Sequence, residues 1–208
     1  GEEEADFGWW MAGLAIDPFD SDHLVYTTGA TVYATRDSAA GAMTWRPWVE
    51  GIEQTAIITL ASPPEGSFSL LSGFGDISGF AHETLDMSPV LQFKTPVFSN
   101  TNTIDYAGMA PAIVVRSGVR PHRIDIGAPT LAWSDDYGRS WTPLVAPPLR
   151  WSDPDGALHE TRFDLTGDRA ITVSADGDVF VFMAPVPIVT HDCGRTWAPS
   201  RGLPLDAR

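Results

Sequence analysis

The segments Ser134-Asp-Asp-Tyr-Gly-Arg-Ser-Trp141 and Thr190-His-Asp-Cys-Gly-Arg-Thr-Trp197 repeat one pattern, Ser/Thr-x-Asp-x-Gly-x-Ser/Thr-Trp. In a tight hairpin such an Asp accepts N–H groups of the turn, Gly takes a positive φ, and Trp packs beneath the turn. A looser copy runs from Thr35-Arg-Asp37 to Thr44-Trp45 through an alanine-rich loop. The pattern therefore predicts β-hairpins that recur along the chain.

Around these repeats the chain consists of short β-type runs bounded by Gly, Pro, Asp and Ser, with almost no helical periodicity. The runs form four clusters, within residues 7–50, 51–100, 101–150 and 151–205. Three or four strands in about 40 to 50 residues is the period of a β-propeller blade. We therefore expect an all-β chain of about four antiparallel four-stranded blades, forming one partial propeller domain over residues 1–208 and part of a seven-bladed ring. The expected strands are Met11–Asp17, His23–Thr28, Thr31–Thr35, Ala56–Ala61, Phe68–Ser72, Phe80–Glu83, Thr103–Ala107, Ala112–Arg116, Thr130–Ser134, Glu160–Leu165, Ala170–Ser174, Val179–Met183 and Ile188–Thr190.

The composition narrows the classes of ligand. The 208 residues include 13 Lys and Arg against 27 Asp and Glu, which gives a net charge of −14. Nucleic acid is not an expected partner because phosphate neutralisation needs clustered Lys and Arg, and an anionic membrane surface would repel the chain. The acidity is compatible with a neutral ligand such as a sugar.

No cofactor or metal is expected. Cys193 is the single cysteine, so the chain has no internal disulfide or Cys-rich zinc site, and we interpret it as an incidental free thiol. The histidines lack metal-ligand spacing. They are His23, His82, His122, His159 and His191. His82 could tune nearby Asp76, although a solvated loop histidine is the favoured interpretation.

The repeats resemble the Asp-box motif of sialidases, sortilin-type receptors and several glycoside hydrolases. In those families the motif is a structural element at the blade periphery, away from the ligand face. By this resemblance Asp136 and Asp192 are structural rather than catalytic.

A second stretch places Asp76 between Gly75 and Gly79 in a loop after a predicted strand: Leu70-Leu-Ser-Gly-Phe-Gly-Asp-Ile-Ser-Gly-Phe-Ala-His82. Small neighbours allow a bulky ligand to approach the carboxylate. From these residues alone, an ordinary turn is the favoured interpretation.

The Gly75–Phe80 loop also belongs to an ordered series of segments. Together with Gly8–Asp22, Tyr26–Tyr33, Gly51–Ala56 and Thr103–Ala107, it resembles the landmarks of glycoside hydrolase family 74, the xyloglucanase and oligoxyloglucan hydrolase family. The resemblance extends from about residue 7 to 205. It implies a secreted hydrolase of plant cell-wall xyloglucan, in which two seven-bladed propellers hold a β-1,4-glucan in the cleft between them. This chain resembles the beginning and middle of the second propeller.

The same resemblance implies roles for individual residues. Asp76 falls at the general acid of an inverting pair, and Ser78 stands where the family more often has Gly. Phe74 and Phe80 could supply apolar surroundings. The sequence holds no second copy of this loop, so the catalytic base is expected on a preceding propeller and the isolated chain is expected to have little activity.

Aromatic candidates for stacking on sugar rings are Trp9, Trp10 and Tyr106, which lie in segments that resemble cleft-facing loops of the family. Burial between blades is the alternative for tryptophans, and it is the expected place of Trp141 and Trp197. Whether cleavage is internal or at chain ends stays open.

Two other functions also remain. A non-catalytic propeller that binds glycan or protein, like the sortilin-type receptors, would not need the Gly75–Phe80 loop. A sialidase would need an arginine cluster for the substrate carboxylate, and the arginines here are scattered in an acidic chain that repels an anionic sugar.

Overall fold

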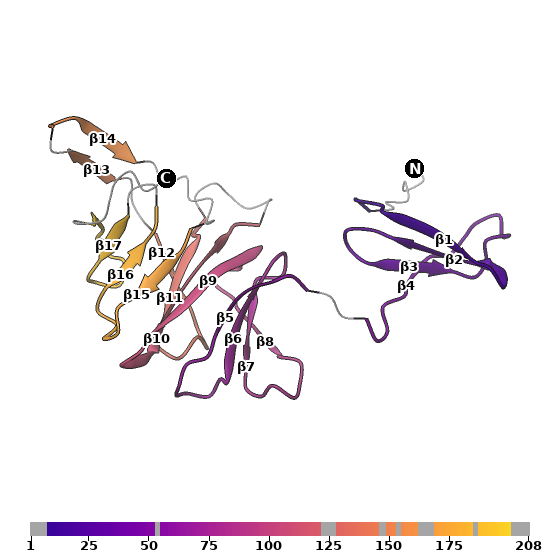
Figure 1. The fold of residues 1–208 in the computed structure, drawn as a ribbon, viewed down its shortest axis with the longest axis horizontal. Coiled ribbons are helices and arrows are strands. Elements are labelled where there is room, and N and C mark those ends of the chain that lie inside the picture. Colours follow the sequence, from indigo (N-terminus) through magenta and orange to yellow (C-terminus); the bar gives the residue numbers. More distant parts are fainter. Residues whose placement is uncertain are drawn as a thin grey trace. The chain divides into compact units, whose positions relative to one another are not determined.

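The structure is a computed structural model that describes residues 8–52, 55–121, 128–145, 149–152, 155–161, 169–184 and 187–200. Within these ranges, all the elements of regular secondary structure are β-strands. None of the described residues forms a helix long and apolar enough to cross a membrane. The chain divides into two compact units, Gly1–Gln54 and Thr55–Arg208, which are described separately (Figure 1).

The first unit is one antiparallel sheet in the order β1-β2-β3-β4. Its strands are β1 (Gly13–Asp17), β2 (Asp20–Thr27), β3 (Val32–Thr35) and β4 (Arg46–Pro47). On one face Tyr26 stacks on Tyr33, with ring centroids 5.2 Å apart, and meets the edge of Trp45 at 4.7 Å. Strand β2 begins at Asp20 rather than at His23, because Asp17 Oδ1 accepts the Phe19 N–H at 2.9 Å and closes the turn early.

The second unit contains three sheets of the predicted kind, each an antiparallel meander of four consecutive strands. The first consists of β5 (Ile57–Ala61), β6 (Leu70–Phe74), β7 (Gly79–His82) and β8 (Leu91–Gln92). The next consists of β9 (Asn100–Ala107), β10 (Ala110–Val119), β11 (Leu131–Ser134) and β12 (Thr142–Leu144). The last consists of β15 (Ile171–Val173), β16 (Phe180–Phe182), β17 (Ile188–Thr190) and β18 (Ala198–Pro199). With the β1–β4 sheet, the described chain has four such sheets, which confirms the predicted all-β fold of propeller blades.

The β9–β12 sheet is covered on both faces (Figure 1). Successive residues of a strand point to opposite faces, and Val114 and Val115 of β10 are both fully buried. Val114 packs in a cluster with Leu71 and Phe93 of the β5–β8 region, whereas Val115 packs with Phe180 of the β15–β18 sheet. Burial of both faces is the packing expected of a blade between two other blades.

One predicted strand pairs differently from the expectation. Glu160–Leu165 was expected to belong to the fourth cluster of strands. Instead Glu160 and Thr161 belong to β14 (Leu158–Thr161), which among the described residues pairs with β13 (Leu149–Ser152) in a two-stranded sheet, whereas residues 162–165 lie outside the described part. The β15–β18 sheet is completed without it by the short strand Ala198–Pro199, a pairing across the turn that hydrophobic pattern alone does not reveal.

Candidate functional site

The candidate site is built on the four-residue connection between β6 and β7, residues 75–78. Main-chain bonds close it: Phe74 N–H donates to Ser78 O and Ile77 N–H to Gly75 O, each at 2.9 Å. Asp76 and Ser78 both have a left-handed backbone, with φ of 67° and 66°. Gly79 must be glycine, because a Cβ there would lie 2.4 Å from Ser72 O and 2.7 Å from the Phe93 ring.

Residues on β8, on β9 and just before β5 anchor this loop. Gly75 N–H donates to Ala56 O just before β5 at 2.9 Å. Asp76 N–H donates to the side-chain oxygen Oδ1 of Asn100 on β9 at 2.9 Å. The Gln92 amide on β8 donates to Ile77 O at 3.1 Å, and the loop backbone is therefore held at successive residues.

Ser78 forms the buried base of the loop. Its N–H donates to Ser99 O at 3.1 Å, and its Oγ accepts the Phe98 N–H at 3.4 Å. It is fully buried and forms an isolated bridge with Asn100. A serine hydroxyl therefore takes part in joining the β5–β8 and β9–β12 sheets.

The Asp76 side chain is exposed. Among the described residues, no hydrogen bond or ion pair is found for its carboxylate. Phe74 and Phe80 lie at the base of the loop with their rings edge to face, 5.8 Å between centroids, and are half-buried. The loop thus fixes the main chain and leaves the carboxylate available to a ligand or for proton transfer.

His82 has neither of the roles considered for it in the sequence. It lies on β7 opposite Leu70, at the far end of the hairpin from Asp76. It is half-buried rather than in a solvated loop, and its Nε2 lies 2.7 Å from Ser72 Oγ. Burial lowers the pKa of His82, and its position on β7 and its contact with Ser72 place it within the sheet, away from Asp76.

The aromatic candidates lie in different places. Trp9 and Trp10 are 59% and 79% exposed in the first unit. Both indoles pack over Gly29, where a Cβ would come within 2.7 Å of Trp9 Nε1. Tyr106 is half-buried on β9 and packs against the core.

The structure does not bring Tyr106 to Asp76. Asn100 contacts the Asp76 loop, and Tyr106 follows six positions later on the same strand, about 20 Å along an extended chain. Tyr106 pairs with Val114, close to Ala112, whose carbonyl accepts the Tyr137 N–H at 3.1 Å. It therefore lies toward the end of the sheet that carries the Ser134–Trp141 turn.

The two repeats, Ser134–Trp141 and Thr190–Trp197, form the predicted turns and are called the repeat turns below. In the first, Asp136 Oδ1 accepts Ser134 Oγ–H at 2.7 Å and Ser140 N–H at 2.8 Å, and Oδ2 accepts Ser140 Oγ–H at 2.6 Å. Gly138 has φ 87°, and Trp141 is buried beneath the turn. The predicted turn geometry is confirmed.

The second repeat turn has the same bonds. Asp192 accepts from Thr190 Oγ1 at 2.8 Å, from Thr196 N–H at 2.8 Å and from Thr196 Oγ1 at 2.7 Å. The looser copy also forms such bonds, since Thr44 N–H donates to both carboxylate oxygens of Asp37, at 3.0 and 3.2 Å.

The repeat-turn carboxylates are held in the ionised form. Burial acts to raise the pKa of Asp136, but hydrogen bonds from Ser140 and Ser134 bring it below its usual range. The Thr196 N–H and hydroxyl lower the pKa of Asp192 to about 2. A carboxylate with this low affinity for protons and these bonds is suited to a structural role.

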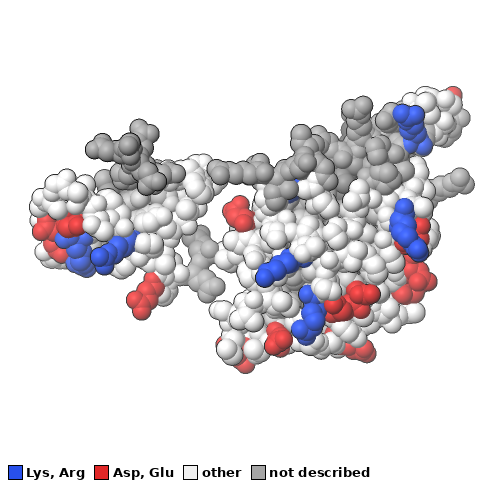
Figure 2. Space-filling model, turned by 180° about the vertical axis from the view of Figure 1, so that it is seen from behind, with Lys and Arg blue, Asp and Glu red and all other residues white. Residues whose placement is uncertain are grey.

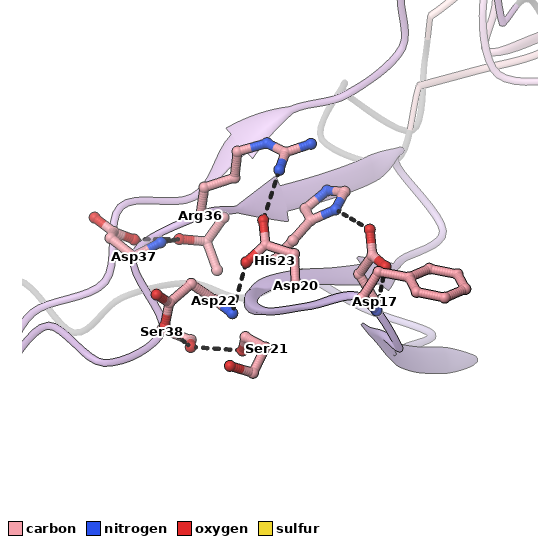
Figure 3. Close-up of polar contacts among 10 residues, drawn as sticks. Asp17, Asp20, Ser21, Asp22, His23, Arg36, Asp37 and Ser38 are labelled. Carbon is pink, nitrogen blue, oxygen red and sulfur yellow. Dashed lines mark hydrogen bonds and ion pairs between the residues drawn. The ribbon is translucent and has the colours of Figure 1, made fainter.

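The acids of the first sheet also have local partners (Figure 3). Asp17 Oδ2 lies 3.2 Å from His23 Nδ1, and Asp20 pairs with Arg36 at 2.9 Å. Asp20 also accepts the Asp22 N–H at 3.2 Å, so these acids stabilise the β1–β2 turn and the end of β3.

Charge and metal-ligating groups are dispersed over the described residues. No group of three or more His, Cys, Asp or Glu is placed to hold a metal ion there. Lys and Arg form no continuous basic surface on the face shown in Figure 2. Cys193 is exposed in the second repeat turn, while His122 and the side chain of His159 lie outside the described part.

No family model matches this sequence. Among curated proteins, it is 35% identical over 219 residues to a probable oligoxyloglucan-reducing end-specific xyloglucanase of Neosartorya fischeri, covering 95% of this chain and 25% of that protein. It is 32% identical over 213 residues to a xyloglucanase of Paenibacillus, covering 100% of this chain and 19% of the relative. The chain thus spans about a quarter or less of the length of these relatives.

Two solved structures share the fold of this chain. A glycoside hydrolase family 74 (GH74) xyloglucanase from Xanthomonas campestris has a TM-score of 0.67 at 34% identity, covering 94% of this chain and 26% of that one. A GH74 enzyme from Niastella koreensis has a TM-score of 0.58 at 23% identity, covering 89% of this chain and 23% of that one. The second of these supports the fold alone.

Proposed function

This chain belongs to glycoside hydrolase family 74, and we propose that it supplies the general acid, Asp76, and part of the substrate cleft of an enzyme that cleaves the β-1,4-glucan backbone of xyloglucan. The supporting observation is the exposed carboxylate of Asp76 on a loop whose main chain is held from β8 and β9. A general acid must reach the glycosidic oxygen from a fixed position, and an exposed carboxylate on an anchored loop supports this role for Asp76.

The proposed reaction inverts configuration. One carboxylic acid protonates the leaving oxygen while a carboxylate about 6.5–9.5 Å away activates water on the opposite face of the sugar. Asp136 and Asp192 are poor candidates for the second group because turn hydrogen bonds occupy their oxygens. We therefore place the catalytic base on a preceding propeller domain, and expect the isolated chain to have little hydrolytic activity.

Substrate binding is proposed for Trp9 and Trp10, whose exposed indoles offer flat apolar faces to a pyranose ring. Tyr106 is a weaker candidate, since it packs on the core toward the repeat-turn end of its sheet. The substrate is a plant cell-wall polysaccharide, and we propose that the enzyme acts outside the cell.

The test compares Asp76→Asn with Asp86→Asn in the natural polypeptide that carries this chain. Asp86 is an exposed acid in the β7–β8 connection and is the matched control. Removal of a general acid lowers the rate by about 10²–10⁴-fold, so Asp76→Asn should abolish most release of reducing sugar from xyloglucan, and Asp86→Asn should not.

Two results would contradict the proposal. Full activity of the Asp76→Asn variant would remove Asp76 from the chemistry. A wild-type protein that binds xyloglucan oligosaccharides without cleaving them would instead indicate the non-catalytic binding module.

A further inference from the structure

The main chain of Asp76 is held by the side chain of a residue on a different sheet. Asp76 N–H donates to Asn100 Oδ1 at 2.9 Å, and the two residues are 24 positions apart in sequence. A left-handed backbone such as that of Asp76, with φ of 67°, is unfavourable for a residue with a Cβ. Asp adopts this conformation more readily than most residues, and the bond to Asn100 holds it further.

The other loop residues are held differently. The N–H groups of Gly75, Ile77 and Ser78 all donate to main-chain carbonyls. Within this loop, only the N–H of Asp76 donates to a side chain, that of Asn100. A substitution at Asn100 therefore removes the acceptor of the Asp76 N–H and leaves the main-chain bonds of the loop in place. Asn100 is half-buried and begins β9, a strand whose Ile104 packs in the core.

We propose that Asn100 is a positioning residue: its amide oxygen fixes the left-handed conformation that aims the Asp76 carboxylate at the glycosidic oxygen. This inference rests on the proposed function. It predicts that loss of the Asn100 amide impairs proton donation to the leaving group without removing the acid itself.

The experiment uses the natural polypeptide with three variants. Asn100→Ala removes the acceptor, and Asn100→Asp keeps an oxygen of the same shape in its place. Gln92→Ala is the matched control, because Gln92 holds Ile77 of the same loop at 3.1 Å and makes no hydrogen bond to Asp76. Each protein is assayed on a xyloglucan oligosaccharide and on an aryl xyloglucan oligosaccharide whose nitrophenolate leaves without protonation.

Asn100→Ala should lower kcat on the xyloglucan oligosaccharide by about tenfold, the loss expected for one hydrogen bond, with little change in KM. Activity on the aryl substrate should fall by less than about twofold, since a good leaving group needs little help from an acid. Asn100→Asp should recover part of the loss. Gln92→Ala should affect both substrates equally.

Hydrogen exchange at the Asp76 amide supplies a second readout that does not depend on activity. It should accelerate in Asn100→Ala and stay near the wild-type rate in Asn100→Asp. Equal losses on both substrates, or unchanged exchange in Asn100→Ala, would overturn the positioning role. Asp76→Asn is measured in parallel: if it keeps full activity, the proposed function fails, and the exchange result still decides whether Asn100 holds this amide.

Discussion

Asp76 and Asp136 both lie in short connections between antiparallel strands, Asp76 between β6 and β7 and Asp136 between β11 and β12. At Asp76 the protein bonds the main chain and leaves the carboxylate exposed. At Asp136 the carboxylate itself accepts three hydrogen bonds from Ser134 and Ser140. The same residue type in a turn thus has its carboxylate either bonded into the fold, as at Asp136, or left exposed, as at Asp76, where we propose a catalytic role.

The largest effect on stability is expected at Arg116, because this residue contacts elements of both turns. Its guanidinium packs over the rings of Phe98 at 4.3 Å and Trp141 at 4.5 Å. Phe98 N–H bonds to Ser78 of the Asp76 loop, and Trp141 ends the first repeat turn. Arg116 is fully buried, and its Nη2 donates to Pro96 O at 2.6 Å.

Arg116→Ala should cost about 3–5 kcal/mol in the free energy of unfolding, since it opens a cavity among aromatic rings. Arg116→Met should stay within about 1 kcal/mol of wild type: it fills the space and removes Nε and Nη1, which lack partners among the described residues. Urea unfolding measures both variants. Equal losses in Ala and Met would show that the charge, not the packing, stabilises this interface. Burial lowers the pKa of Arg116 to about 9, so it remains a cation at neutral pH.

The second prediction sets the two aspartates against each other directly. Asp136→Ala should lower the free energy of unfolding by about 2 kcal/mol, because three hydrogen bonds to a carboxylate in a partly exposed turn are lost. Asp76→Ala should change it by less than about 0.5 kcal/mol, because that carboxylate has no partner to lose among the described residues.

Thermal unfolding of the two variants checks this pair, with Asp86→Ala as an exposed-acid control. If Asp76→Ala destabilised the protein as much as Asp136→Ala, the Asp76 carboxylate would have a structural role after all.

The third prediction concerns Ser78, which lies in the same loop as Asp76. Ser78→Ala should cost about 1 kcal/mol, since it removes the acceptor of the Phe98 N–H and keeps a Cβ in a left-handed backbone with φ of 66°. Ser78→Gly should cost less, because glycine adopts this φ without strain and offsets part of the lost bond. A larger loss for Gly than for Ala, measured by urea unfolding, would show that the added freedom of glycine in the unfolded chain and the lost Cβ contacts outweigh the relief of backbone strain.

The contrast also explains what the sequence could reveal. The bonds of the repeat turns join residues at most four positions apart. A short sequence pattern that contains Ser134, Asp136 and Ser140 is therefore sufficient to predict the turn. Asn100 contacts Asp76 across 24 positions, and no local pattern marks it. This contact follows only from the packing of one sheet on the next.

The same limit accounts for the remaining differences. The alternation of β-type runs was sufficient to predict the four sheets, because each strand pairs with its neighbour in sequence. It could not tell that Glu160 and Thr161 pair with β13 instead, nor that Tyr106 lies toward the repeat-turn end of its sheet. The burial of Arg116 could not be predicted either, because the rings around it belong to residues distant in sequence, namely Phe93, Phe98 and Trp141.

The smallest effect is expected from acid titration of Asp192, the aspartate of the second repeat turn. Thr196 lowers the pKa of Asp192 to about 2 from an ordinary value of 3.8. Because the folded-state pKa is the lower one, the contribution of Asp192 to stability is fully present above pH 4 and is lost as the pH falls from about 4 to 2. Asp192→Asn should therefore lower the melting temperature modestly at pH 7 and flatten its fall between pH 4 and 2.

Cys193→Ser is the matched control for that titration, since it changes the neighbouring residue of the same exposed turn and keeps the carboxylate with its Thr190 and Thr196 bonds. Its melting temperature should follow the wild-type acid profile. If Asp192→Asn kept the wild-type slope below pH 4, the turn would be stabilised by the shape of the side chain rather than by its charge. The role of a repeat-turn aspartate would then be that of a hydrogen-bond acceptor which an amide can replace, whereas the proton donation proposed for Asp76 could not be taken over by an amide.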